Sequence, residues 1–166
     1  MSESLRGSAK LNRGSVPVFH STGEPGYSKA INDDLRRVVA RKIERVVQVR
    51  FTPEACTVKT NEGVVHARPG DAILTGIAGE HWRVSRAHFT EKYRPVSPTR
   101  EGEDGNYLSI ARRILAVQMD ENFEVQLADG KSVLHGKRGD WLVDYGDGSL
   151  GIVSQTIFDV TYLIVA

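Results

Sequence analysis

The sequence predicts a mainly β protein that consists of two similar small β units in tandem, related by a pseudo-two-fold axis. The first observation is an internal repeat, because residues 66–93 align with residues 135–162 at a constant offset of 69, with eight of 28 positions identical. The second is that short runs rich in β-branched residues alternate with glycine turns in both stretches. Self-similarity at a fixed offset indicates a repeated structural unit. We expect each unit to form a partly open barrel or curled sheet with one helical turn.

Composition divides the chain into four parts. Residues 1–31 are rich in Ser, Gly and Lys with few apolar side chains, so we expect a flexible N-terminal arm. Residues 97–105 combine proline, glycine and acidic residues, which is typical of a linker. The two repeat units are therefore residues 32–96, called copy one, and residues 106–166, called copy two.

The first element of copy one is expected to be a short helix that passes into a strand. Asn32-Asp33-Asp34 has the residue types of a helix N-cap, and apolar residues follow at helical spacing. Residues 39–43 are similar to residues 110–114, where β-branched residues favour a strand.

Each copy then follows one plan of five strands and a helical turn. Ser85 and Ser154 have the position of an N-cap, with Phe89 and Phe158 inside the helical turn. The expected strands are 45–51, 56–60, 64–67, 72–75 and 81–84 in copy one, and 113–119, 123–127, 132–136, 141–145 and 150–153 in copy two. A last strand is expected to begin at Tyr93 and at Tyr162.

A Gly-Asp pair precedes the fourth strand of both copies, as Gly70-Asp71 and Gly139-Asp140. Glycine permits a positive φ there, and the aspartate can accept backbone N–H groups and fix the turn. An alternative interpretation pairs each aspartate catalytically with the histidine five residues earlier. Because the pair occurs twice, we favour a structural turn.

These residues resemble those of a known family. The arrangement of Pro69-Gly70-Asp71, an apolar strand, Gly79-Glu80 and Phe89 before Tyr93 is similar to the PGDYG-motif small domains of bacteria and phages, and copy two repeats it with Arg138 in place of proline. The resemblance implies a compact unit in two tandem copies and a bacterial or phage origin, and it implies no activity.

Positions that differ between the copies are the candidates for a binding site, because a duplicated unit can acquire a site where it diverges. Copy one has a basic and aromatic cluster where copy two has mostly small or apolar residues; its members are His81, Trp82, Arg83, Arg86 and His88. Tryptophan with arginine can stack on a ring and neutralise a phosphate. We therefore expect a non-catalytic binding module for an anionic small molecule, a nucleotide or a nucleic acid. The alternative is that Trp82 is a core residue and the arginines are solvated.

The charge distribution supports a second interpretation. Residues 36–96 have a net charge of +6 and residues 106–166 a net charge of −3. Opposite charges on the two copies can attract a second chain, so a structural or protein-interaction role as a homodimer is the alternative function.

Catalytic, metal and cofactor motifs are not apparent. The stretch Gly146–Gly151 matches GxGxxG, but an apolar strand follows it instead of a helix, so we interpret it as a hairpin loop. The histidines lack zinc-site spacing, and Cys56 is the single cysteine. We expect no catalytic residue, metal or cofactor, and a small hydrolase or transferase that uses His and Asp is the third interpretation. The absence of an apolar run of about 20 residues leads us to expect a cytoplasmic protein without a membrane span.

Overall fold

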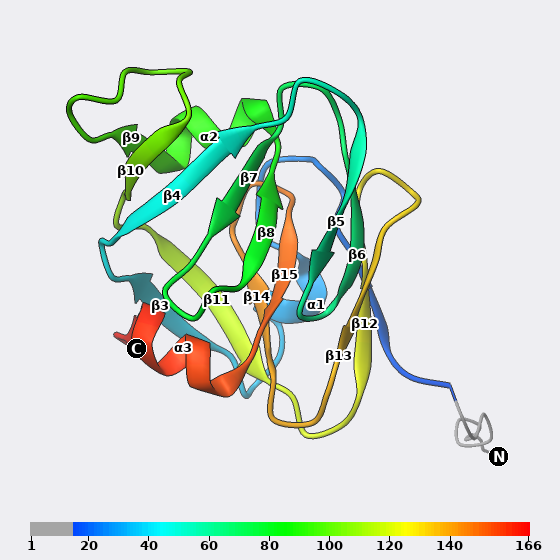
Figure 1. Cartoon of the computed structure of the whole chain (residues 1–166). Helices are drawn as coiled ribbons and strands as arrows, with labels where there is room; N and C mark the ends of the chain where they lie inside the picture. Colours follow the sequence, from blue (N-terminus) through cyan, green and yellow to red (C-terminus); the bar gives the residue numbers. More distant parts are fainter. Residues whose placement is uncertain (1–14) are drawn as a thin grey trace, which may run out of the picture.

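The computed structural model describes residues 15–166 and is mainly β, as the sequence predicts (Figure 1). Two five-stranded antiparallel sheets have equivalent strand orders. The first is β8 (His81–Val84), β7 (Ala72–Thr75), β4 (Val46–Phe51), β10 (Gly105–Ser109) and β9 (Tyr93–Pro95). The second is β15 (Leu150–Val153), β14 (Trp141–Asp144), β11 (Arg113–Gln118), β3 (Val38–Lys42) and β16 (Tyr162–Ile164).

Two hairpins complete the copies. In copy one, β5 (Cys56–Thr60) pairs with β6 (Gly63–Ala67), and in copy two, β12 (Phe123–Gln126) pairs with β13 (Val133–Gly136). The hairpins contact each other, because the N–H of His135 donates to the carbonyl of Glu62 at 2.7 Å and the N–H of His66 donates to Ser132 Oγ at 2.9 Å. The predicted strands of both copies agree with these bounds to within one or two residues.

Each large sheet packs a helix on one face and a shared core on the other. In β14, Trp141 and Val143 contact the core under α3 (Gln155–Thr161), whereas Leu142 points into the core common to both copies. In β7, Ala72 and Leu74 likewise face α2 (Arg86–Lys92), and Ile73 faces the common core. This alternation follows from the two-residue period of a strand, which assigns successive side chains to opposite faces.

The two helices begin as their sequences predict. The hydroxyl of Ser85 accepts the N–H of His88 at 3.4 Å, and the hydroxyl of Ser154 accepts that of Ile157 at 3.3 Å. These bonds satisfy donors that the first turn leaves without a helical partner. Each helix has seven residues, so it is longer than the single turn that we expected. Phe89 and Phe158, at the centres of these helices, are fully buried.

The first strands of the two copies are exchanged. β3 is the first strand of copy one in sequence, but it pairs with β11 and β16 of copy two. Likewise, β10 comes directly before β11 in sequence, but it pairs with β4 and β9 of copy one. Both exchanges have the same register, since Tyr107 lies opposite Val47 and Pro95, as Ala40 lies opposite Ile114 and Ile164. Each sheet therefore contains a strand from the other half of the chain.

This register corrects one sequence comparison. Residues 39–43 were matched to residues 110–114, but the structure makes Ala40 the equivalent of Tyr107. The motif similarity was misleading because an alternating basic and apolar stretch can be aligned in more than one register.

The expected helix at Asn32 is wrong. α1 is Lys29–Asn32, so it ends where the predicted helix begins, and Leu35 is fully exposed. The side chain of Asp34 accepts the backbone N–H of Arg36 at 2.8 Å, and such a turn competes with helix continuation. Ile31 is the buried residue of α1 and joins the common core.

The segment before α1 lies along copy two. β2 (Val18–His20) pairs in parallel with β12, the N–H of Thr22 donates to the carbonyl of Gly148 at 2.9 Å, and the N–H of Ser28 donates to Asp144 Oδ2 at 2.7 Å. The first 14 residues of the expected flexible arm lie outside the described residues. Among residues 15–166, the helices are too short to cross a bilayer.

Candidate ligand-binding cavity

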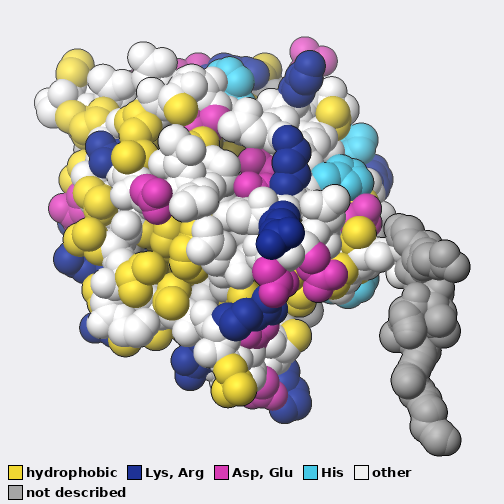
Figure 2. Space-filling model, turned by 90° about the horizontal axis from the view of Figure 1, so that it is seen from below, with side chains coloured by type: hydrophobic (Ala, Val, Ile, Leu, Met, Phe, Trp, Pro, Cys, Tyr) yellow, Lys and Arg dark blue, Asp and Glu magenta, His cyan; other side chains and the backbone are white. Residues whose placement is uncertain are grey.

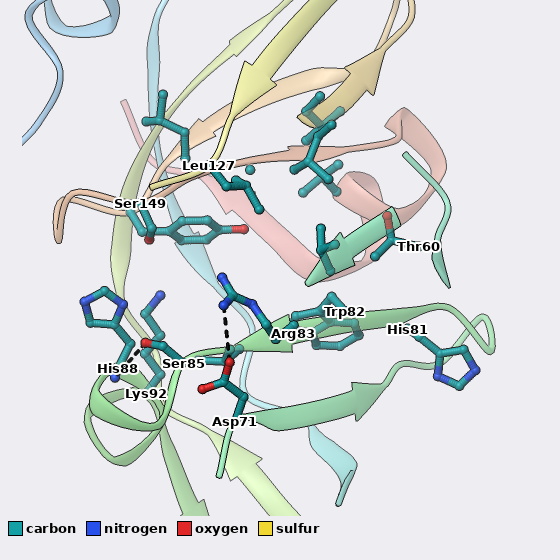
Figure 3. Close-up of a pocket in the computed structure, with 18 of the residues that line it drawn as sticks. Thr60, Asp71, His81, Trp82, Arg83, Ser85, His88, Lys92, Leu127 and Ser149 are labelled. Carbon is teal, nitrogen blue, oxygen red and sulfur yellow. Dashed lines mark hydrogen bonds and ion pairs between the residues drawn. The ribbon is translucent and has the colours of Figure 1, made fainter. Parts of the chain in front are cut away.

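A cavity of about 1100 Å³ lies between the two copies (Figure 3). Copy one contributes one face of the β5–β6 hairpin, strand β8 and helix α2. Copy two contributes β15, the loop that precedes it and the start of α3. Ligand pockets in proteins commonly have volumes of about 300–1000 Å³, so this space can hold a small organic molecule.

Strand pairing directs Arg83 into the cavity. Arg83 of β8 lies opposite Ile73 of β7, and opposite residues of an antiparallel pair point to the same side of the sheet. Because Ile73 faces the common core, Arg83 faces the space between the copies, and Figure 3 shows its side chain rising into the cavity. Its Nη1 lies 3.3 Å from Asp71 Oδ2, whereas its Nε is buried with no hydrogen-bond partner among the described residues.

The two Gly-Asp turns use their carboxylates in related ways. Asp71 accepts the N–H of Arg68 at 2.9 Å, and Asp140 accepts the N–H of Lys137 at 2.9 Å. Gly70 and Gly139 precede them with φ of 90° and 97°. Both carboxylates therefore have the backbone partner that a structural turn requires. Asp71 has the additional role of holding Arg83, whose equivalent in copy two is apolar.

Helix α2 adds two further basic groups to the cavity. His88 and Lys92 are four residues apart and so lie on the same face of the helix. Lys92 Nζ is 3.0 Å from Asp147 Oδ2 and 4.4 Å from the centre of the Tyr145 ring, and His88 Nδ1 is 3.8 Å from the same Asp147 oxygen. These contacts join the helix of copy one to the β14–β15 loop of copy two.

The ion pair changes the acidity of both partners. Burial lowers the pKa of Lys92, and the nearby Asp147 carboxylate opposes this effect. Burial alone would raise the pKa of Asp147, but the Lys92 charge and hydrogen bonds from Ser149 hold it at about 2. Asp147 is therefore ionised throughout the neutral range.

Burial also raises the pKa of other titratable groups at the cavity. Burial, together with repulsion from Asp140, raises the pKa of Glu62 to about 7. Burial also raises the pKa of the Tyr145 and Tyr162 hydroxyls well above the usual range. The cavity lining within residues 15–166 contains eight Lys or Arg residues and four Asp or Glu residues. Its charge is therefore positive.

The five residues proposed from sequence all contribute to the cavity wall, although their side chains differ in direction. Arg83 and His88 lie at the space, and Trp82 is half-buried against the copy-one core. The Arg86 guanidinium instead stacks 4.5 Å from the centre of Phe51, and the exposed His81 ring lies 3.1 Å from Thr75 Oγ1.

Sequence reasoning missed Lys92 and Glu62. Lys92 aligns with Thr161 at the offset of 69, so the divergence between the copies could have identified it. A single helical turn would end before Lys92, so the sequence did not predict that Lys92 lies on the same helix face as His88. Glu62 has no such signal, because only the packing of one copy against the other brings it to the cavity.

Residues 63–163 match the sequence model of one protein family, described as PGDYG protein. The match is one continuous span from β6 to β16, so it includes parts of both copies. No curated protein and no solved structure gives a significant match. Because the family match covers more than half of the sequence, the chain belongs to the PGDYG protein family.

Proposed function

We propose that this protein is a non-catalytic binding module that takes a small anionic ligand into the cavity between its two copies. The observation that carries the proposal is the placement of Arg83, His88 and Lys92 on one wall of a cavity of about 1100 Å³ with an excess of cationic residues. A small molecule fits this space better than a polymer, because the β5–β6 and β12–β13 hairpins contact each other beside it. We also infer that the two copies arose by tandem duplication in a bacterial or phage protein.

The contacts of Asp71 favour binding over catalysis. The hydrolase interpretation required Asp71 to act with His66, but the Asp71 carboxylate contacts the Arg68 N–H and the Arg83 guanidinium. A carboxylate that holds an arginine orients that guanidinium for recognition of an anion.

The test is a calorimetric titration with nucleotides, inorganic phosphate and small carboxylates at low and high salt. We expect at least one anion to bind and its affinity to fall with added salt. Arg83→Gln should weaken binding by roughly 10- to 100-fold, the usual effect of a lost charged hydrogen bond. The control is Arg94→Gln, because Arg94 is an exposed cation of β9 that does not line the cavity. Equal binding by both variants contradicts the proposal.

A second candidate function is self-association through β16. The exposed apolar residues Leu163 and Ile164 lie in this edge strand, where β9 of copy one has Arg94 and Pro95. Charge and proline protect a sheet edge from pairing with another chain, and β16 lacks both. Figure 2 shows hydrophobic side chains gathered on the surface seen from below.

Sedimentation analysis tests this second function. Antiparallel pairing of two β16 strands predicts a dimer that Leu163→Lys converts to a monomer. Val64→Lys, at an exposed position of β6, is the control that should leave the dimer intact. A wild-type protein that remains monomeric at high concentration contradicts this candidate.

A further inference from the structure

We infer that the ligand is an amphipathic organic anion, with a carboxylate or phosphate head at Arg83 and an unsubstituted apolar body against copy two. This inference rests on the proposed binding function and names the chemical class of the ligand. A nucleotide, whose sugar and base carry many polar groups, does not fit this description.

The first step is a comparison of equivalent positions on the two cavity walls. Arg83, His88 and Lys92 line the wall of copy one, and their equivalents at the offset of 69 are Ile152, Ile157 and Thr161. All six residues line the same cavity. At these positions copy one therefore carries basic side chains, whereas copy two carries two isoleucines and a threonine. A ligand that satisfies both walls has a charged end and an apolar body.

The apolar wall extends beyond these two isoleucines. Leu127, Leu134 and Leu150 also line the cavity, and Leu134, Leu150 and Ile152 belong to the core cluster that both copies share. The ligand body would thus extend the hydrophobic core of the protein. Each buried methylene group contributes about 0.8 kcal/mol to such a transfer, which corresponds to roughly a fourfold gain in affinity.

The second step concerns the hydroxyl groups that line the cavity. Ser149 Oγ donates to Asp147, Ser21 Oγ accepts the N–H of Leu150, and Thr60 Oγ1 donates to the carbonyl of Gly63. Ser85 and Ser154 cap the two helices. These groups already have partners within the protein. A polar ligand body would therefore find fewer free partners at these groups, and any of its polar atoms left unpaired would be costly to desolvate.

The third step concerns the anionic head. Arg83 gives one donor to Asp71, and a guanidinium has five. The buried Nε has no acceptor among the described residues, and an unpaired buried donor is unfavourable. An anionic oxygen that enters beside Arg83 provides an acceptor for the free donors. Lys92, in contrast, is already held by Asp147 at 3.0 Å.

The experiment is a calorimetric series of n-alkyl carboxylates and n-alkyl phosphates with chains from about four to about ten carbons. We expect the affinity to rise roughly fourfold per methylene until the apolar wall is covered. The matching n-alkyl alcohols should bind at least tenfold more weakly. Inorganic phosphate and nucleoside monophosphates form the other arms of the series.

Two variants assign the ends of the ligand. Ile157→Ser should flatten the chain-length dependence and leave the affinity for inorganic phosphate unchanged, because Ile157 contributes only to the apolar wall. Val160→Ser is the control on the same helix, since Val160 is exposed and does not line the cavity. Arg83→Met should remove the preference for the anion over the alcohol.

The outcomes distinguish the inference from the proposed function. If a nucleotide binds more tightly than every alkyl anion and Arg83→Gln abolishes its binding, the cavity binds anions but the inference on ligand class is wrong. An affinity that does not depend on chain length also overturns the inference. If no anion binds to the folded wild-type protein, the proposed function itself is contradicted.

Discussion

Single residues at equivalent positions account for the different properties of the two copies. Arg83 is the third residue of β8, and Ile152 is the third residue of β15. Asp71 closes the turn before β7, and Asp140 closes the turn before β14. The recurring aspartate could be recognised as structural from sequence because it is present twice. The role of Arg83 could be proposed from its divergence, but its ion pair with Asp71 depends on strand register, which the sequence alone does not specify.

The two aspartates form a matched pair for mutation. Asp140→Ala removes an acceptor from one turn amide and should lower the free energy of unfolding by about 1 kcal/mol. Asp71→Ala should cost more, about 2–3 kcal/mol, because it also leaves the partly buried Arg83 guanidinium without its carboxylate. Urea denaturation at neutral pH measures both values. Equal losses would show that the Arg83 contact contributes nothing to stability.

Glu62 should make stability depend on pH. Its pKa is about 7 in the folded protein, above the ordinary 4.5, so ionisation destabilises the fold. The penalty is absent below about pH 4.5, grows between pH 4.5 and 7, and is complete above pH 7. Glu62→Gln should therefore stabilise by roughly 1–2 kcal/mol at pH 8, after allowance for solvent screening, and have little effect at pH 4. A gain that does not change with pH contradicts this assignment.

At the scale of the elements, the alternation of side chains made the strands of both copies predictable. The runs around Ile73 and Leu142 each alternate between two cores, and the serine caps define where α2 and α3 begin. α1 was misplaced because its four residues are too short for a periodic signal. β2 was missed because its pairing partner, β12, is about 100 residues away in sequence.

The contact between α2 and the β14–β15 loop is an electrostatic link between elements of different copies. Asp147→Asn leaves Lys92 buried without an ionised partner and should lower the free energy of unfolding by about 2–4 kcal/mol at pH 7. Because the pKa of Asp147 is about 2 in the folded protein and 3.8 ordinarily, its contribution is complete above pH 3.8 and is lost as the pH falls towards 2. Thermal unfolding between pH 2 and 7 measures this loss.

The double variant Asp147→Asn with Lys92→Met is the control for this ion pair. It removes both charges, so it should be more stable than Asp147→Asn alone. A double variant that is less stable than either single variant would indicate that packing, and not charge, dominates at this contact.

At the scale of the whole molecule, the exchange of β3 and β10 makes the two copies interdependent. The repeat predicted two similar units, but it could not reveal the exchange, because either pairing satisfies the same hydrophobic pattern. The cavity lies between the copies, so its position follows from their packing. Its chemistry follows from residues of both halves, such as Lys92 and Asp147.

Cleavage of the segment between β9 and β10 tests this interdependence. A protease site inserted after Glu101, an exposed residue, separates the chain into two fragments. We expect the cleaved fragments to remain associated in native buffer, because β10 stays in the sheet of the first fragment and β3 in the sheet of the second. Size-exclusion chromatography measures the association. Two independently folded fragments would contradict the strand exchange.

The strand exchange also constrains the ancestry of the molecule. A chain with a single copy would have one position to fill between the equivalents of β4 and β9, and it would carry one first strand of its own. Two such chains could complete each other by reciprocal donation of that strand, which is domain swapping. On this view the present chain is a swapped dimer whose subunits have been covalently joined. One copy expressed alone should therefore assemble as such a swapped dimer, and sedimentation analysis measures whether it does.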